Sequence, residues 1–158
     1  MRALARLARR PGTLKRILNL YGPYLGAGIR VQHIADDFSH IRVAMGLRWY
    51  NRNYVGTQFG GSLYSMTDPF MMLMLMRRLG NDYIVWDKSA HIDFVRPGTG
   101  AVSAEFRLDD DTLKAIHSAT ANGEKHLPQW CIDIKDSGGE TVARVTKTLY
   151  VRRKPAAD

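Results

Sequence analysis

An aspartate and a glycine pair lie close together in a segment that could do chemistry. Gly60 and Gly61 come seven to eight residues before Asp68, which directly precedes Pro69 and a run of Met and Leu. A carboxylate can activate a water molecule or attack as a nucleophile. Backbone amides at a helix start lack acceptors and lie at the positive end of the helix dipole, and glycine lets a ligand approach them closely. The segment could therefore supply a base and an oxyanion hole, or the glycines could only permit close packing of helix on sheet.

Asp68 also has a structural interpretation. An aspartate followed by proline is a typical helix start, so Asp68 could be the N-cap of a helix that runs from Pro69 to Leu79 and stops at Gly80. In the other interpretation the helix begins near Gly61, and Pro69 breaks it because proline has no N–H to donate. The two are compatible, because a broken helix can still direct the carboxylate into a cleft.

The elements that must position these residues follow from periodicity. Alternation of apolar and polar residues predicts strands, and acidic caps followed by Asn122-Gly123 predict one short helix. We expect strands at 29–32 and 41–49, a hairpin of 90–97 with 101–108, a helix over 109–123, and a hairpin of 129–134 with 140–151. The sequence predicts an α+β fold, with a curved antiparallel sheet of about six strands wrapped around a long, fully buried central helix.

The ends of the chain are basic. Residues 1–22 are predicted to form a helical arm that Pro11-Gly12 divides, residues 23–154 the main domain and residues 155–158 a short tail. A basic amphipathic arm can lie on a membrane, but we expect it to pack across the domain. The basic ends account for much of the net charge of +8 and suit a solvated surface; no nucleic-acid-binding motif is present, and no nucleic acid partner is expected.

Composition limits the remaining classes of protein. A chain of 158 residues fits one compact domain, and its single cysteine, Cys131, cannot form an internal disulfide, which suits the cytoplasm. The longest apolar run, 70–76, is too short to cross a bilayer, and no secretory signal is evident. The five histidines have no metal-ligand spacing, so no metal site is expected.

Several phrases resemble a known fold family. The pattern N-x-x-G-x-x-x-G-G, which runs from Asn53 to Gly61, is followed seven residues later by an aspartate, and "HIDFVRPG" begins at His91. These phrases resemble the acyl-CoA thioesterases of the hotdog fold. Over about residues 20–154 the chain is most similar to an uncharacterised bacterial hotdog family sometimes labelled tetrameric acyl-CoA thioesterase.

The resemblance implies a role for each matching residue. Asp68 would be the general base or nucleophile, the amides of Gly60 and Gly61 would face the thioester oxygen, and Asn53 would hold the thioester or the water. Where those thioesterases have a histidine before the glycine pair, this chain has Phe59, which would lie against the substrate.

The resemblance also implies a substrate and an assembly. Arg52 or Arg96 would meet the phosphates of CoA, which is part of the substrate, so that no separate cofactor is expected. Asp87, together with Lys88, is a candidate second polar group beside the cleft. We expect a homodimer, and then a tetramer, in which Asp68 of one protomer faces its partner.

Three alternatives remain open. The protein could bind acyl-CoA or a lipid-like ligand without turnover, which Phe59 favours. It could be a hotdog dehydratase, although the glycine segment has no His paired with Asp or Glu. It could also bind nucleic acid or a membrane surface through its basic ends.

Overall fold

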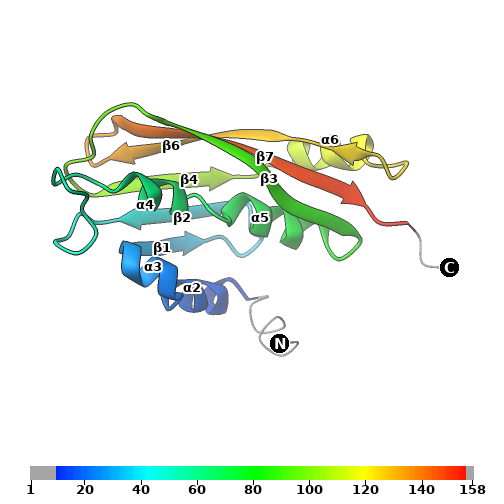
Figure 1. The fold of residues 1–158 in the computed structure, drawn as a ribbon. Coiled ribbons are helices and arrows are strands. Elements are labelled where there is room, and N and C mark those ends of the chain that lie inside the picture. The colour runs from blue at the N-terminus through cyan, green and yellow to red at the C-terminus, as the bar shows by residue number, and fades with distance from the viewer. Residues whose placement is uncertain (1–9, 156–158) are drawn as a thin grey trace.

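One antiparallel sheet forms the body of the protein. The computed structural model describes residues 10–155, and Figure 1 shows the sheet curving behind the central helical segment. The main strands run in the order β1-β2-β4-β6-β7-β3, and the short β5 pairs with β7. The strands are β1 (Ile29–Ile34), β2 (His40–Met45), β3 (Tyr83–Phe94), β4 (Val102–Arg107), β5 (Lys125–His126), β6 (Gln129–Asp136) and β7 (Thr141–Arg153). This sheet and its central helix confirm the predicted α+β hotdog architecture.

The helices cover one face and one edge of the sheet. Figure 1 shows α4 and α5 in front of the sheet, and α2 and α3 beside β1. The helices are α2 (Pro11–Asn19), α3 (Gly22–Ala27), α4 (Gly60–Ser65), α5 (Phe70–Leu79) and α6 (Asp110–Ala119). Period-two alternation on the strands gives the sheet one apolar face, and that face packs on α4 and α5.

The central helix is apolar but not buried on every side. Phe70, Met74 and Leu75 are fully buried in the core, together with Met66, which follows α4. Met76 is 47% exposed, so the expectation of a fully buried helix is wrong for a single protomer. The sheet covers only one side of α5, and the opposite side of the helix faces outward.

The central helix is broken between Ser65 and Phe70. It begins at Gly60, as predicted by the interpretation in which Pro69 breaks it. The predicted Asp68 N-cap is wrong, because Pro69 occupies the cap position of α5 and no side chain caps that end. A turn replaces the lost helical bonding: the amide of Asp68 donates to the Ser65 carbonyl at 3.2 Å. The Asp68 carboxylate is therefore not bound to its own helix.

One predicted strand pairing is wrong. β3 and β4 do not form a hairpin: β3 pairs with β7, and β4 lies between β2 and β6. Alternation identified β4 but only the end of β3, which runs from Tyr83 to Phe94 and not over 90–97. It carries no information about partners, and the connection after β3 crosses to the other half of the sheet. The hairpin of β6 and β7 is confirmed, and Asp136 closes its turn by accepting hydrogen bonds from the amides of Gly138 and Glu140.

Strand β2 is shorter than predicted. It ends at Met45, although the alternation continues to Trp49. The side chain of Asn51 folds this stretch into a turn: its amide nitrogen donates to the carbonyl of Gly46 at 2.7 Å, and its oxygen accepts from the amide of Arg48 at 2.7 Å. These side-chain bonds compete with continuation of the ladder.

The arm helix α2 packs against β1. Leu14 and Leu18 are buried, and the side chain of Asn19 bonds both backbone groups of Val31, at 2.8 and 3.1 Å. This is the packed arrangement that we expected for the arm. The first of its two predicted helices, in residues 2–10, lies almost entirely outside the described residues.

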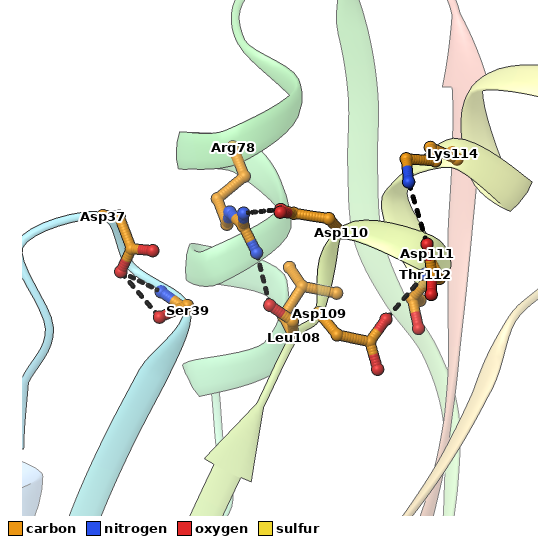
Figure 2. A network of polar contacts seen from close by, with 9 residues as sticks. All are labelled: Asp37, Ser39, Arg78, Leu108, Asp109, Asp110, Asp111, Thr112 and Lys114. Carbon is orange, nitrogen blue, oxygen red and sulfur yellow. Dashed lines mark hydrogen bonds and ion pairs between the residues drawn. The ribbon is translucent and has the colours of Figure 1, made fainter.

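A polar network joins the far end of α5 to α6 (Figure 2). Arg78 donates to the Leu108 carbonyl and pairs with Asp110. Asp109 caps α6 by accepting a hydrogen bond from the amide of Thr112 at 2.7 Å, which confirms the predicted acidic cap. The C-terminal end of the central helix is thereby fixed, and the break lies at the other end of α5.

Candidate functional site

The break in the central helix presents Asp68 to a buried lysine. Lys147 lies on β7 at an inward position of the alternation, between Val145 and Leu149, and its side chain has no exposed surface. Its Nζ lies 2.8 Å from Asp68 Oδ1 and 3.1 Å from Asp87 Oδ2. Because β3 pairs with β7, Asp87 meets the same ammonium group from the neighbouring strand. One lysine thus holds two carboxylates from separate elements.

The charges of this cluster shift one another's titration. Burial works to raise the pKa of Asp68, but the hydrogen bond from Lys147 and one shared with Asp87 outweigh burial and lower it. Burial raises the pKa of Asp87, and Asp68 raises it further against the opposing Lys147. Burial works to lower the pKa of Lys147, but the two carboxylates outweigh burial and raise it. Asp68 is therefore the carboxyl group that remains ionised most readily.

The two carboxyl groups differ in access. The Asp68 side chain is 47% exposed, whereas that of Asp87 is 21% exposed and its Oδ1 is buried without a hydrogen-bond partner. Asp68 can thus meet a ligand from outside, with Lys147 behind it. The ring of Tyr64 lies 5.7 Å from the Lys147 ammonium and helps to enclose it.

Helix α3 is tied to the same place. The hydroxyl of Tyr24 donates to the backbone carbonyl of Asp68. Burial and the Asp68 charge raise the pKa of Tyr24, so the phenol stays protonated as a donor. This bond holds the carbonyl of Asp68 and leaves its carboxylate for other contacts.

An apolar pocket of about 360 Å³ lies between the arm and the helix break. Asp68 is the one charged residue among the described residues that line it. The lining comprises Leu14, Ile17, Leu18, Tyr21, Pro23, Tyr24, Tyr64, Ser65, Asp68, Pro69 and Leu73. The exposed carboxylate therefore borders an apolar space that α2 and α3 help to build.

A second hollow, of about 420 Å³, adjoins this pocket and shares Pro23 and Ser65 with it. Arg52, Phe59 and Gly61 line the second hollow. Three of the residues predicted from the sequence thus lie together, next to the space that Asp68 borders. The first hollow has a largely apolar lining, and Arg52 is the one charged residue among the described residues that line the second.

Each glycine of the pair lies close to a phenylalanine ring. A Cβ on Gly60 would lie 2.9 Å from the ring of Phe94, and a Cβ on Gly61 would lie 2.6 Å from the ring of Phe59. Both distances are shorter than side chains tolerate. Close packing of helix on sheet thus has a direct contact at Gly60, because Phe94 belongs to β3, whereas Gly61 meets only the nearby Phe59.

Asn53 and Arg96 lie elsewhere within one protomer. The oxygen of Asn53 accepts from the amides of Val55 and Thr57, and its nitrogen donates to Thr57 Oγ1 at 2.9 Å, so its side chain shapes a loop. Arg96 pairs with Asp136 at the β6–β7 turn. The structure thus brings neither of them to the carboxylates.

Lys147 is the residue that the sequence interpretation missed. Its signal was present: in "TVARVTKTLYV" it takes a position of the apolar series on a strand. A lysine in such a position needs buried partners. The described residues contain no group of three or more His, Cys, Asp or Glu that could hold a metal ion, and no helix long and apolar enough to cross a membrane.

Comparisons with known proteins agree on the fold. Over 92% of this chain and 99% of the other, the structure resembles a probable thioesterase of unknown function from Pseudomonas aeruginosa, with a TM-score of 0.79 and 18% identity. A putative thioesterase from Shewanella oneidensis matches with a TM-score of 0.65 and 24% identity, over 98% of this chain and 100% of the other. A thioesterase from Haemophilus influenzae matches with a TM-score of 0.65 and 16% identity, over 90% of each chain.

Sequence comparison gives the family. No curated protein matches the chain. The profile of a family described as a domain of unknown function, DUF4442, matches residues 12–151, which cover nearly all of α2, all of α3, the broken central helix and most of β7. The chain therefore belongs to the DUF4442 family and has the hotdog fold.

Proposed function

We propose that the protein hydrolyses acyl-CoA thioesters to a free acid and CoA, with Asp68 as the general base or nucleophile. One observation carries the proposal: the Asp68 carboxylate is held from behind by the buried Lys147 at 2.8 Å, while its open side borders an apolar pocket. A carboxyl group beside a cleft whose pKa is shifted by burial and by a specific charged partner is a candidate functional group. The thioesterase names of the structural neighbours point the same way.

The reaction would proceed through addition of water to the thioester. Asp68 would take a proton from water as the water oxygen bonds to the carbonyl carbon, and the C–S bond would then break. The CoA sulfur would leave with the proton, so that acid and thiol balance one added water. Lys147 would keep Asp68 ionised and oriented, and is a positioning residue. A positioned base of this kind contributes about 10²–10⁴-fold.

The adjoining hollow suits the rest of the substrate. We infer that CoA passes Phe59 and Gly61 and that its phosphates reach Arg52, whose guanidinium can bind phosphate with two hydrogen bonds. The amide of Gly61, at the start of α4, would face the thioester oxygen, with that of Gly60 beside it. Asn53 and Arg96 would act only on a substrate shared with a second protomer.

A second protomer would complete the site. β3 is an edge strand of 12 residues, and around it Ile84, Trp86, Phe94 and Val95 are exposed. Long apolar edges favour pairing with another strand. We infer a homodimer through β3, with a tetramer as a further step. Light scattering of the full chain at low concentration tests this: a monomer would contradict it.

Thiol release from a panel of acyl-CoA thioesters tests the activity. We expect release of free CoA thiol with the wild-type protein, and loss of most of it with Asp68→Asn. The matched control is Asp111→Asn, because Asp111 is an exposed aspartate in the first turn of α6. A wild-type protein that releases no thiol from any member of the panel would refute the proposal.

Binding without turnover is the second candidate function. The pKa of Asp68 favours this function. Burial works to raise that pKa, but the hydrogen bond from Lys147 outweighs burial and lowers it, which makes Asp68 a weaker base. Phe59, in place of the histidine of related motifs, favours it as well. Calorimetry separates the two: micromolar binding of acyl-CoA with no thiol released would support binding alone.

A further inference from the structure

We propose that the pocket between the arm and the helix break binds the acyl chain of the substrate, and that α2 sets the longest chain accepted. The proposal rests on the proposed function, because it takes the thioester to lie at Asp68. It adds the class of substrate: an uncharged, apolar acyl group of short to medium length.

The lining selects for an uncharged apolar group. Leucine, isoleucine and tyrosine side chains form most of it, and Asp68 supplies the one carboxylate among its described residues. A free fatty acid would bring a second carboxylate beside Asp68, and like charges repel at this range. A thioester has no charge at that point. The pocket therefore suits the acyl group before hydrolysis better than the acid that hydrolysis would release.

The volume limits the chain length. A methylene group is about as large as a water molecule, which takes about 30 Å³ in the liquid. A pocket of about 360 Å³ thus holds at most about twelve carbon atoms. This volume is at the small end of the range of ligand sites, roughly 300–1,000 Å³. Longer chains would have to leave the pocket and remain in water.

Helix α2 forms the wall that can be changed without opening the core. Leu14 and Leu18 are buried and anchor the helix, whereas Ile17 lines the same pocket and is only partly buried. The two hydrogen bonds between Asn19 and Val31 fix the helix along β1. A larger side chain at Ile17 would therefore shorten the pocket and leave the anchors in place.

The probes are alkyl-CoA thioethers, which have no carbonyl and cannot be hydrolysed. We expect the affinity of the full chain for the butyl, octyl, dodecyl and hexadecyl thioethers, measured by calorimetry, to rise about fourfold or less per methylene. The rise should stop near dodecyl. Affinity that does not depend on chain length, or that still rises from dodecyl to hexadecyl, would overturn the proposal.

Two variants locate the effect. In Ile17→Trp, affinity should stop increasing at octyl or a shorter chain, and dodecyl binding should weaken at least tenfold and by much more than butyl binding does. The control is Leu20→Trp, because Leu20 follows the same helix, is 75% exposed and does not line the pocket. Equal shifts in both variants, or none with Ile17→Trp, would overturn the assignment of the pocket.

The outcomes separate this proposal from the hydrolysis proposal. In one outcome, affinity depends on chain length, Ile17→Trp lowers the longest chain length that is bound well, and no thiol is released from the matching acyl-CoA thioesters. This outcome supports the pocket assignment and contradicts the hydrolysis proposal. If thiol is released with a chain-length preference that Ile17→Trp does not change, the hydrolysis proposal is supported and the assignment of the pocket is contradicted. If both Ile17→Trp and Leu20→Trp abolish binding of the octyl thioether, the substitutions disturb the arm as a whole. That result would also contradict the assignment of the pocket.

Discussion

Replacing Lys147 with methionine should destabilise the protein and do so in a pH-dependent way. Methionine fills nearly the same space but leaves the carboxyl groups of Asp68 and Asp87 facing each other without the ammonium group. The buried Oδ1 of Asp87 already has no partner. Because the cluster joins β3, β7 and the helix break, its loss should lower the free energy of global unfolding.

The magnitude follows from the geometry. At an effective dielectric constant near 20, contacts of 2.8 and 3.1 Å each give about 5–6 kcal/mol of Coulomb attraction, and desolvation offsets much of it. Breaking a buried pair by removing one partner costs about 3–5 kcal/mol. Asp68 is 47% exposed and can be rehydrated, so we expect a loss of about 2–3 kcal/mol. For a domain of this size the midpoint temperature should fall by about 4–12 °C.

The pH dependence has a definite sign. The lowered pKa of Asp68 gives stability that is present above its unfolded pKa, near 4, and is lost as pH falls through the folded value. The raised pKa of Lys147 gives stability that is lost only as pH rises past its folded value, above about 10.5. The difference between wild type and variant should therefore persist at neutral pH and shrink in acid.

Urea denaturation at neutral pH and well below pH 4 measures this difference. The matched control is Lys114→Met, because Lys114 pairs with Asp111 at a similar 2.9 Å but both side chains are exposed. The control should cost less than about 1 kcal/mol. A Lys147→Met protein as stable as wild type at neutral pH, or a loss equal to that of the control, would refute the reasoning.

Three further predictions concern local structure and titration. Gly28→Ala should lower the free energy of unfolding, measured by urea denaturation, by about 1–3 kcal/mol, because Gly28 has a φ of 75° and a Cβ there would lie 2.6 Å from Asn51 Nδ2. The control is Gly26→Ala, which should leave the free energy of unfolding unchanged because the space around Gly26 is open. Equal losses in the two variants would contradict this prediction. Asp109→Ala should remove the cap of α6 and lower the midpoint of urea denaturation, and an unchanged midpoint would count against the cap. If hydrolysis occurs, kcat/KM should stay constant as the pH is lowered to about 4. The reason is that burial raises the pKa of Asp68 but the hydrogen bond from Lys147 outweighs burial and lowers it. A fall in kcat/KM already near neutral pH would contradict this.

Local patterns in the sequence were sufficient for most elements. Alternation located the strands because one face of the sheet is buried, and Asp109 marked the start of α6 by its capping chemistry. Pro69 marked the break because no proline can donate to the preceding turn. These features depend on neighbours within a few residues, which is why they could be read from one chain.

Long-range pairing was beyond those patterns. The expected hairpin of β3 with β4 was wrong because both strands alternate equally well and only the whole sheet decides that β3 lies beside β7. The same pairing brings Asp87 to Lys147, so the charge cluster could not be predicted either. A buried lysine in an apolar series indicates that partners exist, but it does not identify them.

The roles of the site residues remain predictions. The chain places Arg52, Phe59 and Gly61 in one hollow and Asp68 beside the next, which is compatible with the expected substrate path. The pocket itself lies between the helix break and helices α2 and α3, of which the sequence indicated only α2, as an amphipathic segment. Its contribution to the site depends on where α2 and α3 pack, which no local signal specifies.

The central claim is that Asp68, held by Lys147, performs the hydrolysis. The most direct test is kcat/KM for thiol release by Asp68→Asn and by wild type, on the acyl-CoA that the wild type cleaves best. The amide keeps the shape and can still accept a hydrogen bond from Lys147, but it cannot take a proton from water. We predict a fall of about 10²–10⁴-fold without loss of folded structure. Equal values of kcat/KM for the two proteins would contradict the account.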